Sequence, residues 1–166
     1  MSVFKLPIFG DVVLGESYEI NTRINNQEVP VSLCLEDAET MEEVLPALHA
    51  LSSFLPNLHT HVDTAYQAIF QAFNEDQEWT SAYIQFHLGQ LTPEQIINIV
   101  GTDPTTATAQ QLAQNLELLS IWSSPSADET EIIASFDFTI GQEYTNYVLS
   151  VGFAHDHSVS AIDMES

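Results

Sequence analysis

The sequence predicts an α+β protein in which an N-terminal hairpin and a C-terminal meander form an antiparallel sheet, with the central helices packed on one face. Apolar and polar residues alternate in both terminal thirds of the chain, which is the period of a strand with one buried face. Between them, apolar residues recur every three or four positions, as in amphipathic helices. Since the chain has 166 residues, 45% of them hydrophobic, we expect a single domain over residues 1–166.

Two alternating runs predict the N-terminal hairpin. Ser17 to Ile24 and Glu28 to Leu35 each carry an apolar row, and Asn25 to Gln27 between them has turn chemistry because asparagine tolerates positive φ. Pro30 has no N–H, so it predicts an edge strand or a position near the start of a strand. Val3 to Ile8 is expected to form a further short strand.

Four runs predict the C-terminal meander. Leu116 to Trp122 is apolar on both sides, which is typical of an interior strand. The clearest alternation extends from Ile132 to Ile140, and Tyr147 to Phe153 repeats it. Residues 154–158 then turn the chain, and Val159 to Glu165 is expected to return as the last strand.

Two longer helices are predicted before residue 74. Thr40 and Glu43 have the spacing of a capping box, and apolar residues at helical spacing follow as far as Leu55. Pro46 lies deep for such a cap, so we expect a later start or a kink. A second apolar stripe extends from Leu58 to Phe73, and we expect the two helices to form a helical hairpin on the sheet.

Three shorter helices are predicted next. Trp79 to Leu88 is expected to bury Trp79, Ala82, Tyr83 and Phe86. Thr92 to Gln95 predicts a helix start, because it combines a cap, a proline at the first helical position and a glutamine three residues after the cap. Residues 102–108 break the pattern, and Ala109 to Gln114 is expected to form one or two turns.

The most unusual property of the chain is its charge. It has 24 acidic residues and two cations, Lys5 and Arg23, so its formal net charge is −22. Mutual repulsion of unpaired carboxylates costs stability, but the same charge steers a basic protein partner toward the surface. It repels nucleic acid and anionic membranes. It also excludes most nucleotide, coenzyme A and phosphoryl-transfer enzymes, whose substrates need cations to pair with.

The cellular location follows from three further absences. A single cysteine, Cys34, cannot form an internal disulfide framework. The first residues have no secretory-signal pattern, and the longest apolar runs are too short to span a bilayer. We therefore expect a cytoplasmic protein.

Two histidine motifs are the main candidates for site chemistry. His59-Thr60-His61 lies in a helical pattern, where residues two apart diverge by about 200°, so we interpret these as helix-surface histidines. His155-Asp156-His157 is interpreted as an exposed turn. Cys34 has no accompanying His or Asn signature, and the chain has no glycine-rich phosphate loop. We assign no catalytic, metal or cofactor site. A hydrolase or metal enzyme with clustered His and carboxylates is an alternative from a different class.

Acidic residues gather in three clusters, around residues 36–43, 75–78 and 128–131. Because no lysine or arginine lies within them, we expect a surface of one sign. The candidate partner-binding residues come from the first two clusters: Glu36, Asp37, Glu39, Glu42, Glu43, Glu75, Asp76 and Glu78.

The C-terminal third carries a resemblance. The stretches Phe136-Asp-Phe-Thr-Ile-Gly-Gln-Glu-Tyr-Thr-Asn-Tyr147, Val148-Leu-Ser-Val-Gly-Phe153 and Ile162-Asp-Met-Glu-Ser166 resemble a bacterial family of small, uncharacterised acidic α+β proteins. The motifs are structural, so the resemblance implies no active-site residues. Size, acidity and the lack of an active-site pattern are also similar to bacterial toxin-immunity proteins, which implies binding to a cognate toxin, often a basic nuclease.

We therefore expect an acidic, non-enzymatic binding protein whose acidic loops occlude the basic active site of a toxin domain. A nucleic-acid mimic that inhibits a DNA-binding protein is an alternative, in which the same negative surface would cover the basic site of another partner. A domain adapted to high salt would have the same acidity without any partner.

Overall fold

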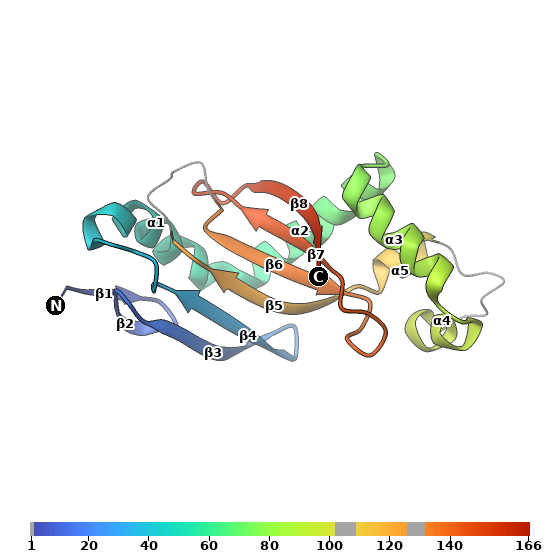
Figure 1. Ribbon diagram of the computed structural model, residues 1–166, viewed down its shortest axis with the longest axis horizontal. Helices are drawn as coiled ribbons and strands as arrows, with labels where there is room; N and C mark the ends of the chain where they lie inside the picture. Colours follow the sequence, from blue (N-terminus) through green and yellow to red (C-terminus); the bar gives the residue numbers. More distant parts are fainter. Residues whose placement is uncertain (1, 102–108, 126–131) are drawn as a thin grey trace.

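The computed structural model describes residues 2–101, 109–125 and 132–166 and confirms the α+β class (Figure 1). Six strands form the main sheet in the order β3-β4-β5-β6-β7-β8, and β1 pairs with β2 in a separate two-stranded sheet. The strands are β1 (Val3–Leu6), β2 (Gly10–Val13), β3 (Ser17–Ile24), β4 (Gln27–Cys34), β5 (Glu117–Ser123), β6 (Ala134–Thr139), β7 (Val148–Phe153) and β8 (Val159–Glu165). The helices are α1 (Met41–Phe54), η1 (Leu55–Asn57), α2 (Leu58–Asn74), α3 (Glu78–Gln90), α4 (Pro93–Val100) and α5 (Ala109–Gln114).

The predicted hairpin and meander are both present, and they join side by side. β3 and β4 are antiparallel, as are the pairs from β5 to β8, whereas β4 and β5 are parallel. A parallel pair needs a long crossover, which the helices supply. β4 is thus an interior strand, and the edge position considered for Pro30 is wrong. Pro30 is tolerated because the parallel pairing begins one residue later, at Val31.

Two turns shape the N-terminal region. Asn25 and Asn26 connect β3 to β4 with φ of 52° and 65°, which is the two-residue hairpin turn that asparagine favours. An earlier turn, with φ of 64° at Ile8 and 77° at Gly10, lets β2 pair back on β1. Strand β2 has only four residues, Gly10–Val13, and was not predicted from the sequence.

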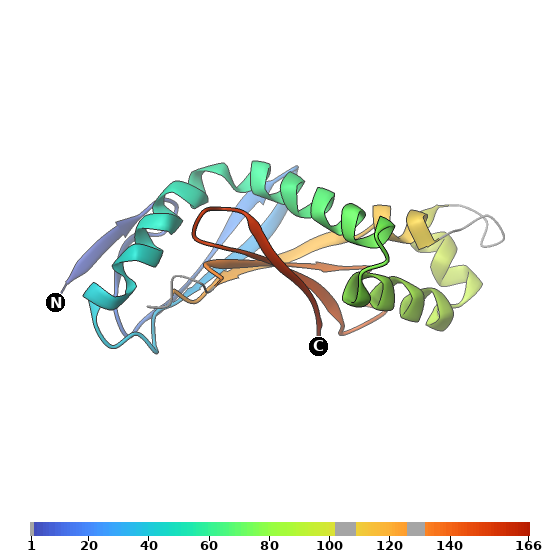
Figure 2. The ribbon, with the colours of Figure 1, turned by 90° about the horizontal axis from the view of Figure 1, so that it is seen from above.

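The first two long helices follow one another as a curved rod that arches over the sheet and changes direction where α1 meets α2 (Figure 2). The predicted helical hairpin is therefore wrong. Leu55 at the start of η1 and Leu58 just after it have right-handed helical dihedrals. Asn57 between them departs from these with φ of −118° and ψ of 32°, which bends the path without reversing it. Thr40 caps α1 as predicted, and α1 begins at Met41 with Pro46 inside it rather than starting later. No helix in the described ranges has the length and hydropathy needed to cross a bilayer.

The core lies between this rod and one face of the sheet. Alternating residues of β4, β6 and β7 are buried on that face, as the sequence predicted: Val29, Val31, Leu33, Ala134, Phe136, Phe138, Leu149, Val151 and Phe153. Phe54 of α1 packs edge-on against Phe136 and Phe153, with ring centroids 5.9 and 5.2 Å apart. Burial of these large rings supplies much of the driving force for folding.

Helix α3 buries Tyr83 as predicted, but the predicted burial of Trp79 and Phe86 is wrong. Thr80, Tyr83, Ile84 and His87 are buried, whereas Trp79 and Phe86 are 44% and 47% exposed. The prediction assigned the aromatic side chains to the interior because they are apolar. The polar atoms of Tyr83 and His87 decide the orientation instead, because both find hydrogen-bond partners in the segment between β6 and β7.

Candidate functional site

The carboxylates lie almost entirely on the surface. Among the described residues, every Asp and Glu is exposed except Asp137. The two cations already stand opposite acids: Lys5 pairs in register with Asp11 across β1 and β2, and Arg23 with Glu28 across β3 and β4. The remaining negative charge therefore has no cation within the chain to neutralise it.

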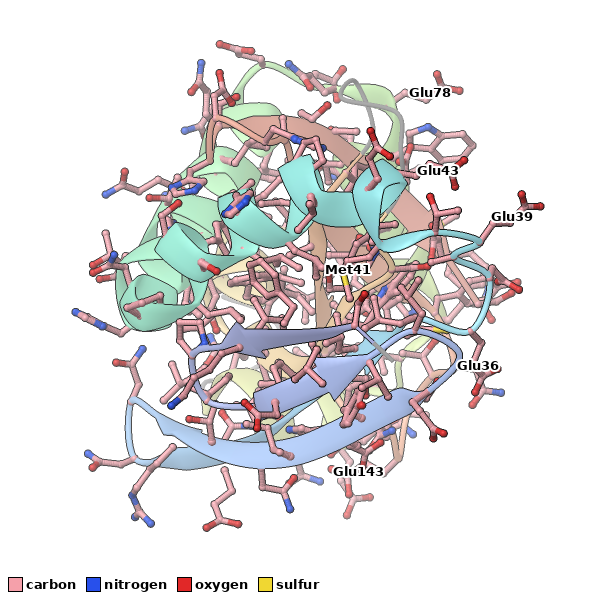
Figure 3. All side chains as sticks on the ribbon, turned by 90° about the vertical axis from the view of Figure 1, so that its left-hand side faces the viewer. Glu36, Glu39, Met41, Glu43, Glu78 and Glu143 are labelled. Carbon is pink, nitrogen blue, oxygen red and sulfur yellow. The ribbon has the colours of Figure 1, made fainter. Side chains whose placement is uncertain are left out.

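The first acidic cluster lies at the start of α1. Thr40 Oγ1 accepts a hydrogen bond of 3.3 Å from the Glu43 amide, and the Ser17 hydroxyl donates to the Glu36 carboxylate at 2.7 Å. Carboxylates in a first helical turn interact favourably with the helix dipole. Figure 3 shows Glu36, Glu39 and Glu43 projecting outward on one side of the molecule. These contacts hold the cluster in place while its charges face solvent.

The second acidic cluster lies at the α2–α3 connection. Gln71 and Gln77 both donate to the Glu75 carboxylate, each at 3.0 Å, and Asp76 has a φ of 53° in the turn. Figures 1 and 2 place this connection at the opposite end of the helical rod from the first cluster. Glu43 and Glu78 look close in Figure 3 only because that view is along the long axis.

The eight predicted partner-binding residues therefore form two separate surfaces. Residues 41–74 represent about 50 Å of helical path at ~1.5 Å per residue. A compact domain of about 100 residues has a radius of gyration of only about 13 Å. A partner of that size bound over one cluster would leave the other uncovered. The third cluster, Asp128, Glu129 and Glu131, lies outside the described residues.

The two histidine motifs meet, which the sequence analysis did not predict. His61 is 8% exposed and lies flat on Phe54, so its interpretation as a surface residue is wrong, whereas His59 is exposed. His157 lies 5.4 Å from His61 between ring centroids, and its Nε2 is 3.2 Å from the Ala50 carbonyl oxygen. The turn at residues 154–158 is thus docked on α1. A φ of 69° at His157 aims the ring there.

His157 of this histidine pair also lies 3.1 Å from the Ser53 hydroxyl oxygen, measured from its Nε2. Within the described residues, no group of three His, Cys, Asp or Glu side chains is arranged to hold a metal ion. Burial lowers the pKa of His61 below its ordinary value of 6.5, and the neighbouring His157 lowers it further. Nε2 of His61 is buried without a hydrogen-bond partner. The pair is consequently a packing contact between α2 and the β7–β8 turn that protonation would disturb.

Asp137 occupies the face of the sheet opposite the rod. Cross-strand neighbours align Ser120, Asp137, Ser150 and Asp163 in one row from β5 to β8. Burial raises the pKa of Asp137 above its ordinary value of 3.8, and hydrogen bonds from Ser150 and Ser120 offset part of that rise. Its Oδ1 atom has no partner. The alternation of β6 placed Asp137 on the polar side correctly, but it did not indicate burial.

An aromatic pocket lies between α3 and the start of β7. Phe86 and Tyr147 line a cavity of about 340 Å³ together with the buried His87. Sequence reasoning missed this site because it assigned Phe86 to the core and Tyr147 to the buried row of a strand. One signal in the sequence could have indicated the buried side of α3. Tyr83 and His87 carry polar groups, and such groups need hydrogen-bond partners when they are buried.

The fold and these surfaces define an acidic α+β protein with one sheet face covered by helices and exposed carboxylates at both ends of the helical rod. Comparisons with protein-family models, with curated proteins and with solved structures gave no match.

Proposed function

We propose that the protein is an acidic binding protein that occludes a basic partner, and specifically an immunity protein for a cognate toxin domain in the cytoplasm. One observation carries the proposal: all described carboxylates except Asp137 are exposed, and both cations of the chain already face an acid. A surface of one sign that costs stability is best explained by a partner of the opposite sign.

The first acidic cluster is the proposed contact surface. It presents five carboxylates within residues 36–43, and the Thr40 cap and the Ser17–Glu36 hydrogen bond restrain the segment before binding. Restraint reduces the entropy lost on association. Carboxylates placed in this way would imitate a polyanionic substrate and cover the basic active site of a toxin, such as a nuclease. The second cluster would add to long-range steering rather than to the contact.

The test is coexpression with any basic protein that is encoded near this chain. An immunity protein restores growth of cells that produce the toxin, and the purified proteins form a complex whose association rate falls steeply between about 0.05 and about 0.5 M NaCl. A tight complex whose association rate ignores salt would contradict the steering mechanism. Growth that stays arrested despite a soluble complex would contradict the immunity function. Inhibition of a DNA-binding protein, without any toxin, would favour the nucleic-acid-mimic alternative.

A further inference from the structure

Phe86 and Tyr147 form an exposed aromatic pair beside the start of β7. Their ring centroids are 5.7 Å apart and their planes meet at 76°. Phe86 is 47% exposed and Tyr147 is 40% exposed, and both line the cavity of about 340 Å³. Exposed aromatic rings around a hollow are typical of recognition sites, since rings supply large contact area at little entropic cost.

Buried residues of α3 hold this pair in position. The Tyr83 hydroxyl donates to the Tyr147 carbonyl at 3.1 Å, and the Tyr147 amide donates to Thr145 Oγ1 at 3.0 Å. Thr145 Oγ1 also lies 2.8 Å from Nε2 of His87. Both backbone polar groups of Tyr147 are therefore fixed while its ring remains open to solvent. The pocket is preformed, which lowers the cost of binding.

His87 adds no positive charge to the pocket. Its Nδ1 lies 2.7 Å from the Tyr83 carbonyl oxygen, so Nδ1 carries the proton and Nε2 accepts from the Thr145 hydroxyl. Burial lowers the pKa of His87, although the bond to Tyr83 raises it in part. The imidazole is therefore the neutral form at physiological pH, and it does not repel a cation.

Charge around the pocket selects the occupant. Two exposed acids are chain neighbours of its lining residues: Glu94 precedes Gln95, and Glu143 precedes Tyr144. The two cations of the chain lie elsewhere, on β1 and on β3 at the far edge of the sheet. An aromatic pair in a negative field attracts a cation through its ring faces.

We infer that this pocket is the docking site for an arginine side chain of a basic protein partner. A guanidinium stacks on aromatic rings, and its N–H groups match the amide oxygens of Gln90 and Asn146, which also line the cavity. The choice of a protein as the source of the arginine rests on the proposed function. The site itself is separate from the first acidic cluster, which lies at the other end of the rod.

The test is an NMR titration of the ¹⁵N-labelled chain with the peptide acetyl-Gly-Arg-Gly-amide. We expect saturable shifts at residues 86–90 and 144–147 and no saturation with the same peptide carrying citrulline, the neutral isostere of arginine. Phe86→Ala and Tyr147→Ala should each weaken binding about three- to tenfold. Tyr147→Phe, which keeps the ring, should bind like the wild type. Trp122→Ala, which removes an aromatic side chain 43% exposed elsewhere, is the matched control and should have no effect.

Two results would overturn the inference. Equal binding of the citrulline peptide would show that charge does not select the occupant. Shifts concentrated at residues 36–43 and unchanged in Phe86→Ala would show nonspecific attraction to the acidic cluster. These results can be told apart from failure of the proposed function. If the Phe86→Ala, Tyr147→Ala double variant captures a basic protein as well as the wild type does, the arginine-docking inference is refuted and the proposed function stands. If the peptide binds in the pocket but the protein neutralises no toxin, the proposed immunity function is refuted and the arginine-docking inference stands.

Discussion

The His61 imidazole lies flat on the Phe54 ring, with centroids 3.8 Å apart and planes within 3°. This stack joins the end of α1 to the start of α2 across η1, and Phe153 of β7 flanks both rings. Nε2 of His61 is buried without a partner, so the site accommodates a neutral ring better than a charged one.

Acidification should therefore weaken the fold through His61. Burial, followed by His157, lowers the pKa of His61 below the ordinary value of 6.5 that it regains on unfolding. The unfolded chain thus binds more protons below that value, and the contribution of His61 to stability, complete above pH 6.5, is lost as pH falls toward the folded-state pKa. We expect the contribution of His61 to the free energy of unfolding to be smaller at pH about 5.5 than at about 7.5.

The measurement is urea unfolding of the wild type and His61→Phe at both pH values. Phenylalanine keeps the stack and cannot be protonated, so the variant should lose part of the pH dependence. Acidification also weakens the repulsion between carboxylates, but it does so equally in both chains. The difference between their free energies of unfolding therefore reports on His61 alone. Identical pH profiles would mean that His61 does not report the titration, and His87 would then be the next residue to replace.

Replacing Asp137 by asparagine should stabilise the protein at neutral pH. Burial raises the pKa of Asp137 above 3.8, so ionising this carboxyl group costs more free energy in the folded state than in the unfolded state. That cost is absent below the unfolded-state pKa and is complete once pH has risen above the folded-state pKa. Because Oδ1 has no partner, the gain of Asp137→Asn should be about 1 kcal/mol at pH about 7.5 and should vanish near pH 3.

Chemical unfolding at these two pH values gives the answer. Asp163→Asn is the matched control, because Asp163 belongs to the same cross-strand row but is exposed. It should change stability by a few tenths of a kcal/mol at most. If Asp137→Asn were destabilising at neutral pH, the ionised carboxylate would be making a favourable contact.

Local patterns predicted the strands well and the helix arrangement poorly. Ile132 to Ile140 and Tyr147 to Phe153 alternate, and alternation alone fixes which side of a strand is buried. The direction of α2 after α1 depends on three residues of η1, and a proline in that joint looks the same whether the chain turns back or continues. The parallel pairing of β4 with β5 depends on that crossover, so sequence pattern could not reveal it either.

The candidate sites were harder to predict, because each joins segments distant in the chain. His61 meets His157 through the β7–β8 turn, and Phe86 meets Tyr147 through the hydrogen bonds of Tyr83. Neither juxtaposition has a signature in local spacing. The acidic clusters were visible in composition, but their separation by the rod was not, since it follows from the continuation of α1 into α2.

Gly152 of β7 is expected to tolerate no side chain. A Cβ built there would lie 2.9 Å from Cγ1 of Ile132, closer than real contacts allow, and it would also meet Cδ1 of that residue. We expect Gly152→Ala to lower the free energy of unfolding by about 1–3 kcal/mol. In an Ile132→Ala background the clash disappears, so the same substitution should be neutral or stabilising, as alanine usually is in a strand. Thermal unfolding of the four chains measures this coupling, and additive effects would refute the contact.

Salt should stabilise the protein in the absence of any partner. The formal net charge is −22 and the described carboxylates are almost all exposed, so repulsion within the folded state falls as the Debye length shortens. We expect the melting temperature to rise by roughly 5 °C between about 0.02 and about 0.5 M NaCl. An equal concentration of a neutral osmolyte distinguishes screening from solvent exclusion. A melting temperature that continues to rise steeply into molar salt would favour the high-salt-adapted domain over a partner-binding surface.

The two acidic clusters should contribute unequally to partner binding, because they lie at opposite ends of the rod. Glu36→Gln, Glu39→Gln and Glu43→Gln together should slow association with the basic partner about tenfold at low salt and weaken the complex. Glutamine at position 36 can still accept the Ser17 hydrogen bond, so the local fold should persist. The matched set, Glu75→Gln, Asp76→Asn and Glu78→Gln, removes the same charge from the other end of the rod and should slow association only slightly. Stopped-flow association kinetics compare the two sets directly. Equal slowing would mean that net charge alone drives the encounter, and a larger effect of the second set would move the contact surface to the α2–α3 connection.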